Sequence, residues 1–222
     1  MDQQVNFFFD PISPYAWLGS KEVPRLEAVG LKVVYQPVLF AGLLNAHGQK
    51  GPAEIEAKRA YIFRDISLLA AQRGYPLQGP PTHPFNPLQA LRMCCALEQG
   101  EARNRLAQAL LDAAWQDGKD ITDVLQLADI ARQSGLSEQE SIQIMQQSIQ
   151  AEAKQALQTA TNAAIANGVF GVPSFLWRGE LFWGCDRVDS LLWRVAGNQI
   201  DEAALQQRLQ RPASAQRKPS NA

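Results

Sequence analysis

Sequence typical of β-strands is confined to the two ends of this 222-residue chain, and the long middle reads as helix. Val5 to Phe9 is a short apolar run, and Lys32 to Val38 is rich in β-branched and aromatic residues. Near the other end, Ser174 to Arg178 and Glu180 to Trp183 flank Gly179, which is typical of a tight hairpin. The pattern predicts one sheet of four strands, assembled from both chain ends around a helical insertion.

The first strand is followed by a turn and then by a helix. Pro14 stands where a helix can start, because the N–H that proline lacks would be unbonded there anyway. Ser13 is therefore expected to cap this helix, and Gly30 to end it. The unit predicts a βαβ crossover with a parallel strand pair. The apolar stripe of this single helix is expected to consist of Leu18, Val23, Leu26 and Val29.

The stretch from Ala53 to Ala166 carries a helical pattern with almost no strand signal. Glycines and prolines separate its segments, and Ser137 with Glu140 three residues later forms a capping box. A further helix, Asp186 to Val195, is expected to close the chain. The helices of the middle stretch are expected at residues 53–73, 87–99, 102–117, 122–134, 138–148 and 150–166.

These patterns predict an α/β fold with a discontinuous domain. Residues 1–45 and 167–210 are expected to form the sheet domain, and residues 46–166 the helical insertion domain. Residues 211–222 lack apolar content, so we expect them to form a disordered tail.

The composition excludes several classes of protein. With 21 basic and 22 acidic residues, the chain shows no charge excess that would indicate a nucleic-acid partner. No apolar run approaches the roughly 18 residues of a membrane span, and no secretory signal is evident, so we expect a cytoplasmic location and no membrane partner. The three cysteines, Cys94, Cys95 and Cys185, are expected to be reduced thiols. His47 and His83 lie far apart, so no metal site is expected.

The segment FFFDPISPYAWLG places a hydroxyl, that of Ser13, between a buried strand and the start of a helix. Backbone N–H groups at such a position stabilise an anion, and a thiolate would fit there. The alternative is that Ser13 only caps its helix.

The segment GVFGVPSF places Pro173 at the start of a strand, where proline cannot donate to a central ladder. A cis Val172–Pro173 bond is one solution, and the N–H and C=O of Val172 would then be able to pair with an extended peptide. An ordinary trans proline is the alternative.

Together these two segments resemble the thioredoxin superfamily, and the helical insertion narrows the resemblance to its DsbA-like branch. SPYA stands where redox members carry their two cysteines, so Ser13 and Ala16 replace them. Since disulfide exchange needs a thiolate nucleophile, the resemblance implies a protein without dithiol chemistry.

Within that branch the chain is similar to kappa-class glutathione transferases and, more closely, to 2-hydroxychromene-2-carboxylate isomerases. The resemblance covers roughly residues 4–196 and includes PVLFAGLLNAHGQKGP, KRAY, PFNPLQALR and FWGCDR as well as the two segments above. It implies a glutathione-dependent isomerase of aromatic degradation, with a small aromatic-derived carboxylic acid as substrate and a homodimeric assembly. A conjugating transferase or peroxidase, or a non-catalytic binding module, remains as an alternative.

The resemblance also implies roles for individual residues. Ser13 would hydrogen-bond the glutathione sulfur, and the Val172–Pro173 segment would pair with its cysteinyl backbone. The turn that holds the γ-glutamyl group would consist of Trp183, Gly184, Cys185, Asp186 and Arg187. Asp186 is suited to accept the ammonium group, and the alternative is that it serves only as an N-cap.

Two positions depart from the family pattern, and three more are candidates for the substrate site. Cys185 stands where Asn or Ser is usual, and Gln49 stands where Asn is usual. Cys185 is the weaker hydrogen-bonding group, and its alternatives are a mixed disulfide with glutathione or a small buried thiol. Lys50 and Lys58 are candidates to pair with the substrate carboxylate, or are solvated surface charges, and Asn86 is a further pocket candidate by family position.

Overall fold

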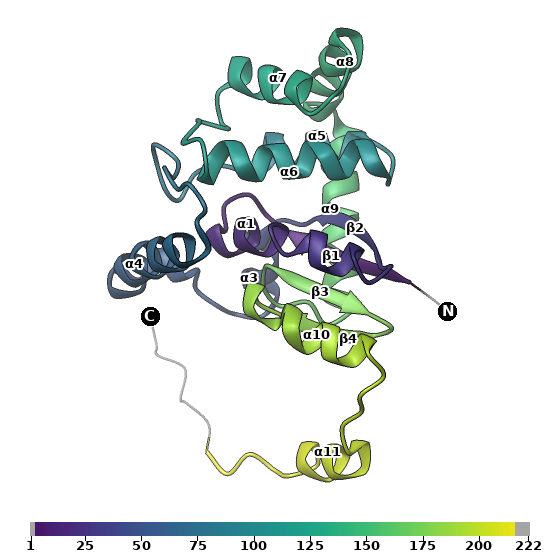
Figure 1. The fold of residues 1–222 in the computed structure, drawn as a ribbon. Coiled ribbons are helices and arrows are strands. Elements are labelled where there is room, and N and C mark those ends of the chain that lie inside the picture. Colours follow the sequence, from purple (N-terminus) through teal and green to yellow (C-terminus); the bar gives the residue numbers. More distant parts are fainter. Residues whose placement is uncertain (1–2, 216–222) are drawn as a thin grey trace.

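The computed structural model describes residues 3–215, and its centre is the expected four-stranded sheet with the order β2-β1-β3-β4 (Figure 1). Strand β1 (Gln4–Phe9) pairs in parallel with β2 (Lys32–Pro37) and antiparallel with β3 (Ser174–Trp177). Strand β4 (Glu180–Trp183) forms the hairpin with β3. Strands from the two chain ends therefore share one sheet, as predicted.

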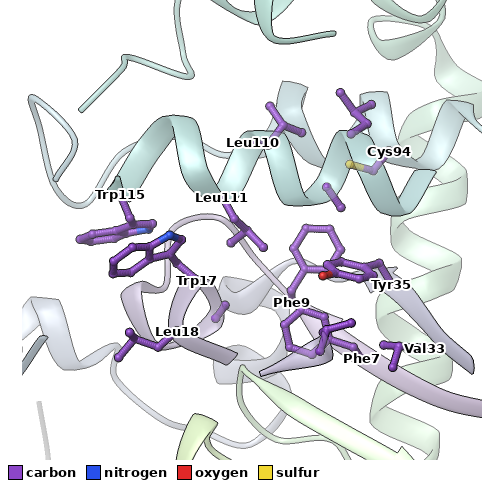
Figure 2. Packing of buried hydrophobic residues seen from close by; sticks show 14 of the residues in the cluster. Phe7, Phe9, Trp17, Leu18, Val33, Tyr35, Cys94, Leu110, Leu111 and Trp115 are labelled. Carbon is purple, nitrogen blue, oxygen red and sulfur yellow. The ribbon is translucent and has the colours of Figure 1, made fainter. Parts of the chain in front are cut away.

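The central strand β1 separates two hydrophobic layers because successive side chains point to opposite faces. Phe7 and Phe9 belong to the larger core, where Phe7 meets Tyr35 edge-on with the ring centroids 4.9 Å apart (Figure 2). Phe8 points the other way, into a smaller cluster with Val38.

The single helix expected after the first strand is two helices, so that prediction is wrong. Helix α1 (Pro14–Ser20) ends before helix α2 (Val23–Glu27) begins. Pro24 has no N–H to bond the carbonyl of Ser20, so the first helix cannot continue through it. Val29 lies beyond both helices and is 53% exposed, so it does not contribute to the buried stripe.

The middle stretch is helical, as predicted, and most of its helices begin and end within a few residues of the expected positions. The capping box is confirmed, since Ser137 and Glu140 bond each other's backbone N–H. The helices are α4 (Glu56–Arg73), α5 (Leu88–Ala96), α6 (Glu101–Trp115), α7 (Val124–Gln133), α8 (Glu138–Ser148) and α9 (Ala151–Ala166).

Two helices were not predicted from the sequence, α3 (Phe40–Ala46) and α11 (Glu202–Leu209), nor was the 3₁₀ turn η1 (Pro52–Glu54). The expected closing helix consists of a 3₁₀ turn, η2 (Cys185–Arg187), followed by α10 (Val188–Val195).

The expected tail is described only in part. Residues 211–215 form neither helix nor strand, and residues 216–222 lie outside the described residues. The expected domain boundaries remain predictions.

Helix α6 joins the insertion to the sheet domain. It packs on α1 on one side and on α7 on the other (Figure 1). Trp115 at its end and Trp17 of α1 both belong to the larger core (Figure 2), and the Trp17 indole N–H donates to Asp112 at 2.9 Å. One hydrophobic core therefore runs through both parts of the chain.

Two further properties concern residues 3–215 alone. None of the helices described there has the length and apolar character needed to cross a membrane. That part of the chain also contains no group of three or more His, Cys, Asp or Glu side chains placed to hold a metal ion.

Candidate functional site

Ser13 lies at the junction of β1 and α1, as the sequence predicted. Its backbone is extended, and its hydroxyl oxygen accepts the N–H of Ala16 at 3.3 Å, which confirms it as the N-cap. The same hydroxyl donates to the carbonyl oxygen of Val172 at 3.5 Å, across 159 residues of sequence. Ser13 is 7% exposed. The Ser13 hydroxyl therefore bonds both its own helix and the GVFGVPSF segment, which is far away in the sequence.

The Val172–Pro173 peptide bond is cis. Pro173 packs against α1, where a Cβ added at Gly19 would lie 3.1 Å from the proline Cβ. The Val172 N–H has no hydrogen-bond acceptor among residues 3–215, although the residue is buried. A buried backbone N–H is normally bonded, so this one is available to an extended ligand.

The turn before Ser13 is held by Asp10, a residue that the sequence analysis quoted in its motif but did not select. Its buried carboxyl group accepts the N–H of Ile12 at 3.0 Å and that of Phe40, the first residue of α3, at 2.9 Å. Burial raises the pKa of Asp10 to about 7, and the two backbone hydrogen bonds act in the opposite direction. Asp10 thus ties the turn before Ser13 to the start of α3.

Two donors from the helical insertion hold the carbonyl groups of the same turn. The Trp115 indole N–H donates to the Pro11 oxygen at 2.8 Å. The His83 imidazole Nε2 lies 3.0 Å from the Ile12 oxygen. Sequence analysis did not select Trp115 and considered His83 only as a metal ligand, because contacts across more than 70 residues leave no local signal.

Helix α4 packs beside α1. The Tyr15 hydroxyl, from the SPYA segment, donates to Asp65 at 2.8 Å, and the Tyr61 hydroxyl lies 3.5 Å from the other oxygen of the same carboxylate. Neither Asp65 nor Tyr61 was predicted from the sequence. These contacts fix α4 against the start of α1 (Figure 1).

The predicted FWGCDR turn lies next to the cis-proline loop. The Gly184 N–H donates to the carbonyl oxygen of Pro173 at 2.9 Å. Trp183 is 54% exposed, and its ring meets that of Phe170 with the centroids 4.8 Å apart. Phe170 was quoted in the GVFGVPSF segment but not selected. The turn therefore adds an exposed aromatic surface to the site.

Asp186 and Arg187 form an exposed ion pair in this turn. The hydrogen bond from Arg187 lowers the pKa of Asp186. The interpretation of Asp186 as an N-cap is wrong, because η2 begins after Gly184, α10 begins after Arg187, and neither helix has a side-chain cap. The Asp186 carboxylate is therefore free of a capping role and ionised at neutral pH.

Cys185 is a buried thiol in the larger core, 6% exposed. Burial raises its pKa to about 11. Because the thiolate is the reactive form, this environment opposes a mixed disulfide and favours the alternative of a small buried residue.

The remaining predicted residues lie outside this cluster of contacts. Gln49 and Lys50 are exposed between α3 and η1, and Lys58 is exposed in the first turns of α4. Asn86 is exposed, and its side chain accepts the N–H of Leu88 at 3.1 Å, which is a local role at the start of α5. Their part in substrate binding remains a prediction.

A cavity of about 950 Å³ lies elsewhere, between the sheet and α9. It is lined by Asn6 and Gln36 of the sheet and by Gln155 and Thr159 of α9, and Ser13 is not part of it. This cavity therefore lies on the face of the sheet that carries Phe8 and is separate from the Ser13 site.

Comparison with known proteins agrees with this architecture. A family model described as a DSBA-like thioredoxin domain matches residues 4–196. Glutathione S-transferase kappa 1 of Rattus norvegicus is 25% identical over 201 residues, which cover 85% of this chain and 89% of that protein. A 2-hydroxychromene-2-carboxylate isomerase of Sphingobium xenophagum is 28% identical over 199 residues, which cover 86% of this chain and 97% of the relative.

A solved structure of 2-hydroxychromene-2-carboxylate isomerase shares the fold. It superposes with a TM-score of 0.78 at 21% identity, covering 94% of this chain and all of that one. The predicted resemblance is confirmed at the level of the family and the fold. Because the family model spans the strands of both chain ends and the helical insertion between them, the chain belongs to the DSBA-like thioredoxin domain family.

Proposed function

We propose that this protein is a glutathione-dependent isomerase that interconverts 2-hydroxychromene-2-carboxylate and trans-o-hydroxybenzylidenepyruvate in aromatic degradation. The observation that carries the proposal is the contact of the Ser13 hydroxyl with the Val172 carbonyl, beside an unbonded Val172 N–H. Neither Ser13 nor Ala16 carries a thiol, so a thiolate at this position must belong to a ligand. The names of the relatives, glutathione S-transferase kappa and 2-hydroxychromene-2-carboxylate isomerase, support a glutathione-related isomerase or transferase.

The residues present fit a bound tripeptide. The Val172 N–H and C=O would pair with its cysteinyl backbone in the manner of an added strand. The Asp186 carboxylate would accept a hydrogen bond from the γ-glutamyl ammonium group, and this bond would replace part of its ion pair with Arg187. Trp183 and Gly184 would shape that end of the site, and Gln49 would contact the glycyl end or the substrate.

Ser13 would act on the ligand sulfur without becoming a nucleophile. The 3.5 Å hydrogen bond to Val172 is long and therefore easily exchanged for one to sulfur. The Ser13 hydroxyl oxygen would still accept the hydrogen bond from the Ala16 N–H, and accepting this bond makes the hydroxyl a stronger donor. When bound, glutathione would supply a thiolate that adds to the conjugated carbon of the open-chain acid, which turns the double bond into a single bond that can rotate, and that is released again when the double bond re-forms.

Lys50 and Lys58 would pair with the substrate carboxylate, and Asn86 would line the pocket. Both lysines are exposed and lie close to or within helix α4, which packs beside α1. The proposal includes a homodimer and a cytoplasmic location, as the family resemblance and the sequence predicted.

Glutathione titration by calorimetry tests the binding half of the proposal. Asp186→Ala is expected to raise the Kd about tenfold or more, because it removes a charge-assisted hydrogen bond. Asp189→Ala, a nearby exposed carboxylate that pairs with Arg25, is the matched control and is expected to leave the Kd unchanged. Absence of binding to the wild type, or equal binding by Asp186→Ala, would contradict the proposal.

Turnover tests the catalytic half. Ser13→Ala is expected to lower kcat for isomerisation about tenfold or more, through loss of the hydrogen bond to the thiolate. Ser137→Ala also removes a helix N-cap, but far from the site, and so controls for the loss of a cap. A binding module predicts instead that the wild type shows no turnover and that Ser13→Ala binds glutathione normally.

A conjugating transferase is the second candidate, favoured by relatives that carry the name glutathione S-transferase kappa. It would use the same thiolate but consume glutathione. An assay of free thiol during turnover separates the two, because an isomerase returns every equivalent, and a net loss of thiol would reject the isomerase.

A further inference from the structure

His83 makes a contact that its sequence context does not explain. It lies between α4 and α5, and its ring is packed against Phe63 and Trp115, with centroids 5.4 Å away in both cases. Its Nε2 atom lies 3.0 Å from the carbonyl oxygen of Ile12, the residue before Ser13. A histidine that only filled space would not need this contact.

The contact fixes which nitrogen carries the proton. A carbonyl oxygen can only accept, so Nε2 must be the donor, and Nδ1 is left as an acceptor in the neutral ring. Nδ1 is buried and has no partner among residues 3–215. Protonation would bury an N–H with nothing to bond, close to the cation of Arg59, and burial indeed lowers the pKa of His83. The neutral Nε2–H form is therefore the stable one.

The groups around the ring do not offset this preference. Arg59 of α4 disfavours the imidazolium. The carboxyl group of Asp10, two residues before Ile12, already accepts hydrogen bonds from the Ile12 and Phe40 N–H groups. The remaining ring neighbours are aromatic: Phe63, Phe85 and Trp115.

His83 thus completes the bonding of the turn. The backbone carbonyl of Asp10 accepts a hydrogen bond from the Ser13 N–H. The carbonyl of Pro11 accepts one from the Trp115 indole N–H, and the carbonyl of Ile12 accepts one from the His83 Nε2–H. Because the Ile12 carbonyl and the Ser13 N–H belong to one peptide unit, a donor on that carbonyl fixes the plane from which the Ser13 side chain projects.

We propose that His83 is a positioning residue for the thiolate site: its Nε2–H holds the Ile12–Ser13 peptide so that the Ser13 hydroxyl faces the ligand sulfur at Val172. The inference rests on the proposed function, because it assigns His83 an effect on the bound thiol. His83 touches no ligand atom and acts through Ser13.

The test is the pKa of glutathione bound to the folded protein, measured from the ultraviolet absorbance of the thiolate as a function of pH. His83→Phe keeps a ring but removes the donor, and is expected to lower the thiolate-to-thiol ratio about five- to tenfold. His83→Gln restores an N–H donor and is expected to recover most of that loss. Phe85→Leu disturbs the packing of the ring but leaves its hydrogen bond, and is expected to leave the thiol pKa unchanged.

The outcomes separate this inference from the proposed function. If the wild type binds glutathione and His83→Phe leaves the thiol pKa unchanged, the positioning role is refuted while the function stands. If Phe85→Leu changes the pKa of bound glutathione as much as His83→Phe does, and His83→Gln does not restore it, the positioning role is also refuted, and the effect is due to packing of the ring. If the wild type does not bind glutathione, both fall together.

A measurement on the unaltered protein keeps the inference testable even if His83→Phe does not fold. The nitrogen-15 NMR shifts of the His83 ring are expected to show a proton on Nε2 and none on Nδ1 at neutral pH. A ring protonated on Nδ1 alone, or on both nitrogens, would overturn it.

Discussion

Replacement of Asp10 by asparagine should remove a pH dependence from the stability of the whole protein. The residue is 1% exposed, its carboxyl group forms no ion pair within residues 3–215, and its partners are two backbone N–H groups. Burial disfavours its charged form more than those two hydrogen bonds favour it, so its pKa rises to about 7. The folded protein therefore binds this proton more tightly than the unfolded chain does.

The sign and the size of the effect follow from linkage. A carboxyl group with a raised pKa in the folded state stabilises that state at low pH, and this contribution is lost as the pH rises from 3.8 to about 7. At about 1.4 kcal/mol for each pH unit, this interval corresponds to at most about 4.5 kcal/mol. The asparagine side chain of the variant cannot titrate, and its amide NH₂ leaves one backbone N–H unbonded, at a constant cost of about 1–3 kcal/mol.

The assay is urea unfolding of wild type and Asp10→Asn across this pH range. The difference in unfolding free energy, wild type minus variant, is expected to fall as the pH rises, because the contributions of other titrating groups cancel. Asp201→Asn, at an exposed helix cap, is the control and is expected to show no such trend. A difference that stays constant, or that increases with pH, would refute the reasoning, because it would mean that the backbone hydrogen bonds outweigh burial.

Three further results are expected. Phe7→Ala should lower the unfolding free energy by about 3–5 kcal/mol in urea, because its ring is fully buried, whereas Val29→Ala should change it little; similar losses for both would contradict the described core. Gly19→Ala should weaken glutathione binding several-fold, because the added Cβ would lie 3.1 Å from Pro173, and unchanged affinity would argue against the position of that loop. Cys185 should react with a thiol reagent only on unfolding, since burial raises its pKa to about 11; rapid labelling of the native protein, located by mass spectrometry, would contradict this.

Local signals explain what could be predicted from the sequence. The strands of both ends, the hairpin at Gly179 and the capping box at Ser137 each depend on neighbouring residues, and each is found. The Ser13 cap is also local, and its meeting with Val172 was anticipated only through the family resemblance.

Long-range contacts explain what could not be predicted. Helix α3 has no local cap, because its N-cap residue is Leu39; its first N–H is bonded instead by Asp10, 30 residues earlier. The donors that hold the turn before Ser13, from His83 and Trp115, are 71 and 104 residues from the carbonyls they bond. The sequence analysis also missed two local signals: Pro24, which separates α1 from α2, and Asp201, which caps α11 by accepting the N–H of Ala204.

These contacts give the helical insertion a structural role at the site. The sheet domain supplies Ser13 and Val172, but it leaves two carbonyl groups of the turn to be bonded from outside, by His83 and Trp115. Trp115 also belongs to the larger core, as does Trp17 (Figure 2). A buried carbonyl without a donor is costly, so the turn depends on the insertion for its conformation. The insertion is thus part of the structure that holds the proposed thiolate site, and a chain without it should lose the geometry of Ser13.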